Sequence, residues 1–447
     1  MAESATARGA STRLLAVVGC ARTSRGWQSA VRRRQFLLHT AGLTGATALG
    51  AAGLSACSAE TDTPLKLLVA SYDKSVGSSI GDQWGSLIGA FEKAHPGIGV
   101  DLERVPFAKL DQTLARRVKD GDAPDIAQSN LFAPYAEDGR LYGASDLFDV
   151  RTEGDFIRSY AEAGMVDRVQ YGLPFLASTP RLFYNKALFK QARVKAPRSW
   201  AELRDAAVAL KAIGVPTPYG LQLGPEAAED EVLAWLLADG GGYAGLTGYD
   251  FANPSNIDTL TWLRDNLVTR GLAGPDPKSL TRTDAYAQFL RGKIGMLIAH
   301  PVLMGAADQA EFPYAHAPFP RKLGGAAPPV GLNDWLMAFK QNGRREQCGT
   351  FLSYLYGRKS ALAYGGSQSA LPVTSSASDA LRKDPKQRPM WDFIDQMPEA
   401  QFQPTNLRSW PEVRNAVRRR IGEGVVKGGN PEEVLEGLDA VAAQAEL

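Results

Sequence analysis

The chain has 447 residues, of which 50 are Lys or Arg and 48 are Asp or Glu, so its formal net charge is +2. Residues 1–56 hold seven Arg and one acidic residue, so residues 57–447 carry 43 basic and 47 acidic side chains and a net charge of −4. A phosphate-binding surface needs clustered excess positive charge, and this balance therefore argues against nucleic acid as a partner. The length after residue 56 is enough for two lobes.

The amino-terminal segment is typical of an export signal. Arg33 and Arg34 precede Phe-Leu and a mildly apolar stretch, residues 37–52, which is too short and too weakly hydrophobic for a membrane span. The paired arginines indicate a signal of the twin-arginine type. We therefore expect residues 1–56 to be a signal peptide that directs export.

The signal ends at a sequence that predicts lipid anchoring. Leu-Ser-Ala before Cys57 resembles a bacterial lipobox, in which a peptidase cuts before the cysteine and the thiol carries lipid. Residues 57–64 are polar and predict a tether. We expect a lipoprotein at the outer face of the cell membrane. Cys348 is then left without a disulfide partner and is expected to be buried.

The next segment alternates between strand and helix patterns. This order predicts a parallel sheet flanked by helices, in which ligands lie at the carboxyl ends of the strands. Tyr72, Asp73, Ser129 and Asn130 follow two such ends, and Phe107 begins the helix after a third. These five residues are ligand-binding candidates. The expected strands cover 65–70, 100–103 and 125–128, and the expected helices cover 84–91 and 107–118.

The second half is richer in helix patterns. Ser199 with Glu202 forms a capping-box pattern, and Asn253-Pro254 is typical of a helix start. The triplet 418–420 is typical of a solvated helix face. Strands are expected at 182–184, 294–299 and 333–339, and helices at 199–213, 226–239, 255–270, 281–292, 346–364 and 410–445, the last interrupted at 428–431.

Patterns for catalysis and cofactor binding are largely missing. The sequence lacks HExxH, CxxC, GxSxG and GxxxxGK[ST], and its histidines are not spaced as metal ligands, so no cofactor and no metal are expected. Residues 240–245 match GxGxxG but follow a helix pattern instead of a strand, which predicts a loop. Carboxylate pairs for glycoside hydrolysis remain open, because their separation is spatial.

Short segments distributed over residues 91–373 resemble, in the same order, those of family 1 extracellular solute-binding proteins, the sugar-binding receptors of ABC importers. The resemblance implies an α/β fold of two lobes with the ligand cleft between them. It also implies crossover segments near 175–182, 299–301 and 345–358. The matching segments are 91–97, 121–125, 171–175, 183–189, 199–203, 289–293 and 371–373.

We expect residues 65–178 and 300–350 to form one lobe, and residues 179–299 and 351–447 to form the other. A sugar has flat apolar faces and a girdle of hydroxyls, so its site needs aromatic platforms and fixed polar groups. Trp235 and Trp335 are platform candidates. The resemblance supports further polar candidates in the cleft, namely Ser178, Thr179, Asn333, Asp334 and Arg408.

The expected function is capture of a carbohydrate or sugar-like solute outside the membrane and its delivery to the permease subunits of an ABC transporter. We expect a monomer without enzymatic activity. Within this class the alternative ligand is a glycerophosphodiester or an amino sugar. The competing class is an enzyme that acts on cell-wall carbohydrate.

Overall fold

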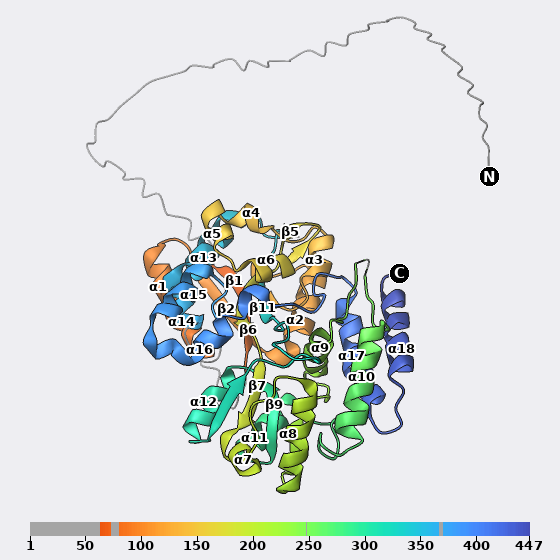
Figure 1. Cartoon of the computed structure of the whole chain (residues 1–447). Coiled ribbons are helices and arrows are strands. Elements are labelled where there is room, and N and C mark those ends of the chain that lie inside the picture. The colour runs from red at the N-terminus through yellow and green to blue at the C-terminus, as the bar shows by residue number, and fades with distance from the viewer. Residues whose placement is uncertain (1–62, 73–79, 247, 366–369) are drawn as a thin grey trace, which may run out of the picture. The chain divides into compact units, whose positions relative to one another are not determined.

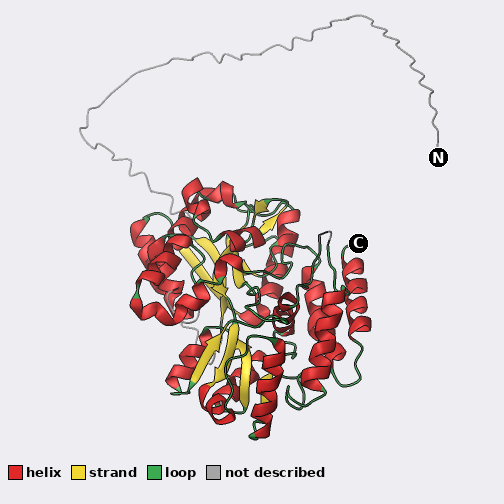
Figure 2. Ribbon diagram, in the orientation of Figure 1, coloured by secondary structure: helices red, strands yellow, loops and turns green. Residues whose placement is uncertain are grey.

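The computed structural model describes residues 63–72, 80–246, 248–365 and 370–447 (Figure 1). The expected export residues Arg33 and Arg34, the expected lipidation site Cys57 and the ligand candidate Asp73 lie outside these residues. Within them, helices surround two larger sheets (Figure 2). We call each sheet with its helices a lobe.

Lobe 1 is built on a five-stranded sheet in the order β2-β1-β3-β11-β6. The predicted parallel pairing is confirmed, because β1 is parallel to both of its neighbours, β2 and β3. The later strand β11 is antiparallel to β3 and β6. The strands are β1 (Leu65–Ser71), β2 (Val100–Pro106), β3 (Ile126–Ser129), β6 (Leu173–Ser178) and β11 (Leu332–Ala338), with a separate hairpin of β4 (Met165–Val166) and β5 (Val169–Gln170).

Helices from two distant parts of the chain cover this sheet. They are α1 (Ile80–Ala94), α2 (Phe107–Lys119), α3 (Ala133–Glu137), α4 (Ala144–Leu147), α5 (Val150–Gly154), α6 (Arg158–Ala163), α13 (Arg345–Tyr356), α14 (Arg358–Gly365), α15 (Ser375–Lys383), η3 (Pro385–Gln387), α16 (Arg388–Ile394) and η4 (Met397–Glu399).

The central strands β1 and β3 of lobe 1 are buried on both faces. In β1, Leu67 and Val69 pack with the apolar stripe of α1, while Leu68 and Ala70 pack with that of α2. This separation follows from the alternation of side chains along a strand. A central strand between two helix layers is apolar at nearly every position. Cys348 on α13 is buried and free, as predicted.

Lobe 2 is built on a four-stranded sheet in the order β10-β7-β9-β8, in which β8 and β9 are parallel and the other pairs antiparallel. Its strands are β7 (Arg181–Asn185), β8 (Thr217–Gly220), β9 (Ile294–Ala299) and β10 (Tyr314–Ala317). Its helices are α7 (Lys186–Ala192), α8 (Trp200–Ala212), α9 (Ala228–Ala238), α10 (Pro254–Leu263), the π-helical turn η2 (Arg264–Val268), α11 (Arg282–Leu290), α12 (Val302–Gln309), α17 (Trp410–Val425) and α18 (Pro431–Ala445).

Local signals fix several helix starts in lobe 2. The Ser199 hydroxyl accepts a hydrogen bond from Glu202 N at 3.2 Å, and Asn253 Oδ1 accepts one from Asn256 N at 3.0 Å. Both contacts satisfy free N–H groups in the first helical turn, as the capping patterns predict. The expected break near residue 430 also occurs, between α17 and α18.

The chain crosses between the lobes three times, and two of these crossings differ from the prediction. The first lies at residues 179–180, between β6 and β7, as expected. The second lies at 318–331 instead of 299–301, because β10 pairs with β7 at the edge of the lobe 2 sheet. The third lies at 400–409 instead of 345–358, because α13 and α14 pack on α1 and α4, Ser376 bonds to Asp155, and η4 packs on α6, all within lobe 1.

The predicted lobe boundaries are therefore wrong at two places. Residues 302–317 belong to lobe 2, and α14, α15 and η4 belong with lobe 1, while α16 also contacts lobe 2 through Asp392 with Arg181 and Phe393 with His316. The second and third crossings run side by side, since Gly331 N donates to Gln401 O at 2.8 Å and Gln401 N donates to Pro329 O at 2.9 Å. These two segments are thus fixed to one another where the chain changes lobe.

Candidate functional site

One edge of the lobe 1 sheet gathers most of the predicted polar residues. The carboxyl ends of β1, β2, β3 and β6 lie at the same edge as the amino end of β11, because β11 is antiparallel to its neighbours. Loop residues at such an edge are the usual ligand contacts of α/β sheets. The predicted residues that lie there are Tyr72, Phe107, Ser129, Asn130, Ser178, Asn333 and Asp334.

Asp334 is at the centre of a hydrogen-bonded cluster at this edge. The Tyr72 hydroxyl donates to Asp334, and Gln128 Nε2 lies 2.7 Å from Asp334 Oδ2 and 2.6 Å from the Tyr72 oxygen. Gln128 is fixed in turn, because its Oε1 accepts from Ala70 N at 3.0 Å. The Asn130 side chain also bonds to Asp334, while its Oδ1 is buried and has no hydrogen-bond partner among the described residues. Neutral groups therefore hold the Asp334 carboxylate, and Asn130 Oδ1 is left as an acceptor without a donor from the described residues.

An aromatic pair lies beside this cluster. The rings of Tyr72 and Phe107 are stacked, with centroids 5.4 Å apart and planes 27° apart. Phe107 is 44% exposed although it is a large apolar residue. A partly exposed ring next to fixed hydrogen-bonding groups offers an apolar face and polar partners at one place.

Asp111 on α2 links this edge to lobe 2. Ser129 Oγ donates to Asp111 Oδ1 at 2.7 Å, and Arg414 Nη2 of α17 lies 3.8 Å from Asp111 Oδ2. Arg414 is mostly buried, and its Nε has no hydrogen-bond partner among the described residues. The contact between the lobes thus includes a buried N–H donor that the described chain does not use.

Lobe 2 contributes a network of charged side chains from three helices. Arg418 on α17 binds Glu229 on α9, with Nε 2.8 Å from Oε2. Arg282 on α11 lies 3.4 Å from Glu226, which also accepts from Thr283 N at 2.9 Å. Each of these guanidinium groups therefore already has a carboxylate partner.

Asp230, next to Glu229 on α9, lies within the same network but is held differently. Its Oδ1 accepts a hydrogen bond from the Gln403 amide, which comes from the third crossing. Burial, together with the charge of Glu229, raises the pKa of Asp230 to about 7, against the opposite influence of nearby arginines such as Arg282. Burial also raises the pKa of Asp334.

A second polar contact joins the lobes near the first crossing. Ser178 Oγ lies 2.9 Å from His300 Nδ1, and His300 N donates to the Tyr286 hydroxyl at 2.8 Å. Burial lowers the pKa of His300 to about 3, with the charge of Arg282 adding to the effect. The imidazole is therefore neutral near pH 7 and takes part as a hydrogen-bonding group.

The prediction that Trp235 is an exposed platform is wrong. Its side chain is fully buried in the core of lobe 2, edge-on to Trp200 at 5.1 Å, and its Nε1 donates to Glu231 at 3.1 Å. The helix that carries it is buried almost all round, so no face of the ring is open. Trp235 is a core residue.

The same correction applies to Trp335. It is 1% exposed, and its ring packs against Phe132 at 5.1 Å on the face of the sheet covered by α2 and α3. A Cβ added at Gly164 or Gly172 would lie 2.9 Å from this ring. Close backbone approach thus encloses Trp335 under the sheet edge instead of leaving it at the surface.

Two polar predictions also find protein partners. The Thr179 hydroxyl is buried, donates to Phe393 O at 3.0 Å and accepts from Gln396 at 3.2 Å, so the chain uses both of its functions. Arg408 is exposed and lies 2.8 Å from Asp138 and 3.6 Å from Glu137 of α3. Arg408 joins the third crossing to lobe 1, and these contacts do not support the predicted role as a ligand donor.

Sequence reasoning missed the charged residues of α2, α9, α11 and α17. Asp111 could have been found, because it lies one helical turn after Phe107 and so shares its face. The triplet 418–420 is not wholly a solvated face, since Arg418 reaches the buried Glu229 and Arg420 donates to Gly437 O at 3.0 Å. The remaining partners come from helices, strands and loops that no local spacing connects. They are Gln128, Glu226, Glu229, Asp230, Arg282, Tyr286, His300, Gln403 and Arg414.

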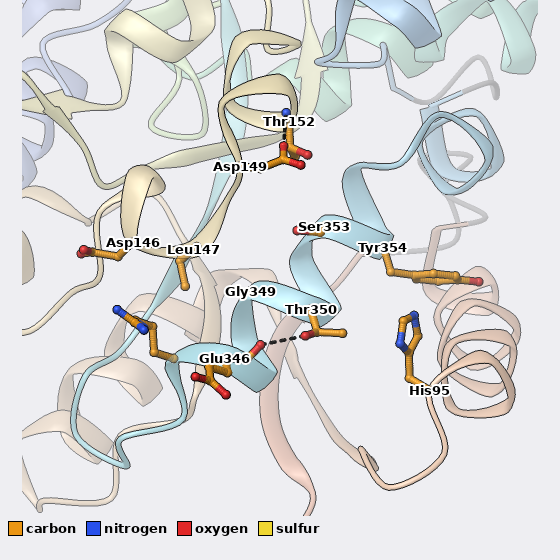
Figure 3. A pocket seen from close by; sticks show the side chains of 11 residues that line it. His95, Asp146, Leu147, Asp149, Thr152, Glu346, Gly349, Thr350, Ser353 and Tyr354 are labelled. Atoms are coloured by element: carbon orange, nitrogen blue, oxygen red, sulfur yellow. Dashed lines mark hydrogen bonds between the residues drawn. The ribbon is translucent and has the colours of Figure 1, made fainter.

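A cavity of about 610 Å³ lies elsewhere on lobe 1, between α13, α4, α5 and the end of α1 (Figure 3). Two of its three carboxylates serve the fold: Asp146 accepts from Gly143 N at 3.0 Å, and Asp149 accepts from Thr152 N at 2.7 Å. Both are helix-capping contacts. We therefore place the candidate site at the sheet edge, where unused polar atoms and both lobes meet.

Two further searches cover the described residues only. No helix in them has both the length and the apolar character that crossing a membrane requires. No three of their His, Cys, Asp or Glu side chains are grouped as metal ligands would be.

Several curated proteins are similar to this chain. It is 25% identical over 366 residues to a protein of Brucella abortus (strain 2308) that is named as a binding protein, which covers 79% of the chain and 87% of that relative. It is 23% identical over 424 residues to the sn-glycerol-3-phosphate-binding periplasmic protein UgpB of Pectobacterium atrosepticum, covering 87% of the chain and 88% of the relative. The multiple sugar-binding protein of Streptococcus mutans is 25% identical over 289 residues, covering 60% and 66%.

Solved structures share the fold. The cyclic alpha-maltosyl-1,6-maltose binding protein from Arthrobacter globiformis has a TM-score of 0.72 at 19% identity, covering 86% of this chain and all of that one. UgpB from Mycobacterium tuberculosis in complex with glycerophosphocholine has a TM-score of 0.70 at 20% identity, covering 86% and 98%. The expected two-lobed binding-protein fold is confirmed.

The family follows from a comparison with family models. The model described as bacterial extracellular solute-binding protein matches residues 77–361, which is well over half of the chain. The chain therefore belongs to the bacterial extracellular solute-binding protein family.

Proposed function

We propose that this chain captures a sugar or a sugar-like polyol between its lobes and delivers it to the permease of an ABC importer, without chemical change to the ligand. The proposed contacts are the predicted residues of the lobe 1 edge together with charged residues of lobe 2. They are Tyr72, Asp73, Phe107, Ser129, Asn130, Ser178, Asn333 and Asp334 from lobe 1, and Glu226, Asp230, Arg282 and Arg414 from lobe 2.

One observation carries this proposal. On either side of the Asp111–Ser129 contact lie a buried acceptor, Asn130 Oδ1, and a buried donor, Arg414 Nε, for which the described residues supply no partner. Buried polar atoms are normally hydrogen-bonded, so an unused pair indicates a group that arrives from outside. A hydroxyl can both donate and accept, and it suits such a pair.

The surroundings of this pair also fit a polyol. The Tyr72–Phe107 ring pair gives an apolar surface for the C–H face of a sugar. Gln128 and Asp334 are held in place by their mutual hydrogen bonds before any ligand arrives. Groups that are already oriented lose little conformational freedom on binding, which favours affinity.

Export and anchoring belong to the same proposal. The pair Arg33-Arg34 supports export directed by a twin-arginine signal, and the lipobox before Cys57 supports attachment to the outer face of the membrane. Replacing Cys57 by Ala should release the protein from membranes into the medium or periplasm. A membrane-bound form that retains residues 1–56 without lipid, seen by mass spectrometry, would contradict this.

Relatives supply a second candidate ligand. The binding protein of Pectobacterium atrosepticum is named for sn-glycerol 3-phosphate, and the Mycobacterium tuberculosis structure contains glycerophosphocholine. A glycerophosphodiester also presents hydroxyls, but it adds a negative charge. The two candidates can therefore be separated by the charge of the ligand.

The test is a thermal-shift screen of the purified chain against neutral saccharides, amino sugars and glycerophosphodiesters, followed by calorimetric titration of the hits. A ligand that binds only the native state adds to the free energy of unfolding, by about 2.7 kcal/mol at a hundredfold excess over Kd. The added stability raises Tm. We expect one ligand per chain, recovered unchanged after incubation. Turnover of the ligand would support the enzyme class instead, and no shift with any compound would contradict the proposed function.

Asn130→Ala tests whether the unpartnered Asn130 Oδ1 binds the ligand. Its Oδ1 has no partner in the described chain, so its loss should weaken ligand binding, while loss of the Asn130 contact to Asp334 should lower apo stability by about 0.5–1.5 kcal/mol. Asn266→Ala on η2 is the control, because Asn266 only donates locally to Trp262 O at 3.2 Å. Equal affinity of Asn130→Ala and the control would move the site away from this edge.

A further inference from the structure

The site contains more carboxylates than cationic groups. Where the two lobes contact each other, three guanidinium groups each have a carboxylate partner within 3.8 Å. Two carboxylates are left without a guanidinium partner in the described part of the chain. The pairs are Arg282 with Glu226, Arg414 with Asp111 and Arg418 with Glu229, and the remaining carboxylates are Asp230 and Asp334.

Both remaining carboxylates are held by neutral groups. Asp334 accepts from the Tyr72 hydroxyl and from the Gln128 amide, and Asp230 accepts from the Gln403 amide. Neutral donors orient a carboxylate but do not cancel its charge. Because a partly buried charge without a counter-charge is costly, each position would gain from a positive group supplied by the ligand.

The two carboxylates lie on opposite lobes within one polar network. The Asn130 side chain bonds to Asp334, and its neighbour Ser129 donates to Asp111. Arg414 lies beside Asp111 and also interacts with the charge of Asp230. A ligand held between the lobes at the Asn130 and Arg414 atoms therefore meets negative charge from both sides.

We infer that this site selects a polyol that carries a protonated amine, such as an amino sugar or an aminocyclitol, over a neutral sugar and over a phosphate ester. This inference rests on the proposed function and names its ligand class. A phosphate would have to displace an existing carboxylate from a guanidinium and would face the remaining carboxylates at short range, which disfavours it by repulsion.

Two matched series of compounds test the inference by titration calorimetry on the purified full chain near pH 7. Glucosamine is compared with glucose and glucose 6-phosphate, and the chitosan disaccharide with cellobiose and N,N′-diacetylchitobiose. sn-Glycerol 3-phosphate and glycerophosphocholine complete the set. Within a series the shape is similar and the charge changes. We expect the amine to bind at least about tenfold more tightly than its neutral counterpart, the scale of one favourable charge contact.

The variants Asp230→Asn and Asp334→Asn locate the effect. Each keeps the shape of the side chain and removes its charge, so each should lower the affinity for the amine more than the affinity for the matching neutral sugar, and the ratio of the two should fall. Asp205→Asn is the control, because the Asp205 side chain is 66% exposed on α8 and its ion pair, among the described residues, is with the adjacent Arg204. Apo Tm is measured for each variant, so that loss of binding is distinguished from loss of folding.

The pH dependence gives an independent readout. Asp230 faces Glu229 on its own helix, Arg282 of α11, Arg414 and Arg418 of α17 and the Gln403 amide. A cationic ligand favours its ionised form, so amine affinity should rise several-fold between about pH 5 and about pH 6.5, a range in which an amine with a pKa of about 7.7 stays almost fully protonated. The rise should be absent in Asp230→Asn.

Each outcome has a separate meaning. Tighter binding of a neutral sugar or of a phosphate ester than of the matching amine overturns this inference and leaves the proposed function standing. An amine preference that survives in both Asn variants also overturns it. Failure of every compound to bind contradicts the proposed function and this inference together.

Discussion

The two lobes present different chemistry to the space where they meet. The edge of lobe 1 offers groups at strand ends, where the carboxylate of Asp334 is held by hydroxyl and amide donors. Lobe 2 offers side chains from helices α9, α11 and α17, where ion pairs such as Glu229–Arg418 dominate. One side is built mainly from neutral hydrogen bonds and the other from charges.

This difference follows from the elements that carry the groups. Backbone pairing fixes a strand end in direction and register, so short side chains such as Asn130 point in a defined way. Long arginine side chains on helices keep more freedom and take their positions from opposite charges. Lobe 1 is thus suited to define the orientation of a ligand, and lobe 2 to sense its charge.

The largest effect should come from the core under the lobe 1 edge. Trp335→Ala removes a fully buried ring and should lower the free energy of unfolding by about 3–5 kcal/mol, measured by urea denaturation of the apo protein. The matched control is Phe107→Ala, on the same side of the sheet but 44% exposed, which should change apo stability little. Similar losses in both variants would show that Trp335 is not enclosed as described.

The next effect distinguishes the lobes by pH. Burial raises the pKa of Glu231 to about 7, where its neutral form is stable in the fold. The stability that neutral Glu231 contributes is complete below its unfolded pKa of about 4.3. It is lost as pH rises through about 7, and the free energy of unfolding falls by up to about 1.4 kcal/mol per pH unit. Glu231→Gln should therefore flatten the fall in apo Tm between these values. An unchanged slope would assign the pH dependence to other groups.

Breaking the charge pair of lobe 2 should have a smaller effect. Glu229 is 2% exposed, and Glu229→Gln leaves Arg418 without its carboxylate, which should cost about 2 kcal/mol of stability by chemical denaturation. Glu412→Gln, on an exposed position of the same helix as Arg418, serves as the control and should be neutral. The expected loss should shrink at high salt; a loss independent of salt would indicate a packing defect.

The exposed ring of lobe 1 should matter for ligand and not for folding. Phe107→Ala should weaken binding of the best ligand by about 1–2 kcal/mol, since the ring surface that the ligand covers is lost. Phe107→Leu, which keeps apolar area without a flat face, should fall between wild type and Ala in the same titration. Wild-type affinity in Phe107→Ala would remove the aromatic pair from the proposed site.

The smallest effect concerns the exposed bridge between the lobes. Arg408→Ala removes the contacts to Asp138 and Glu137, and exposed ion pairs contribute about 0.2–1 kcal/mol. Apo Tm should change little, while ligand affinity should fall slightly and lose part of its salt dependence. A loss of binding comparable with Phe107→Ala would restore Arg408 as a direct ligand contact.

The sequence predicted the parts of the fold that depend on local patterns. The parallel β1, β2 and β3, the intervening helices and the capped starts at Ser199 and Asn253 all follow from periodicity and end signals. Chain order then placed Tyr72, Ser129 and Asn130 at one edge.

Tertiary pairing explains what could not be predicted. Trp335 and Leu336 face opposite sides of a central strand with helices on both faces, so neither side is open, and the sequence of β11 does not show this by itself. The lobe assignment of β10 depends on its pairing with β7, about 130 residues earlier by the registered partners. Likewise, the partners of Asp111 and Glu229 come from α17, near the end of the chain.

The position of β11 in the sheet has a consequence for how the chain acquires its structure. β11 lies between β3 and β6, yet it is made about 150 residues after β6. A chain that ends before residue 332 therefore leaves the facing sides of β3 and β6 unpaired, and unpaired strand edges invite association with other chains. Lobe 1 consequently completes its sheet only after every strand of the lobe 2 sheet has been synthesised, so partial chains of this protein are expected to need protection from aggregation until β11 arrives.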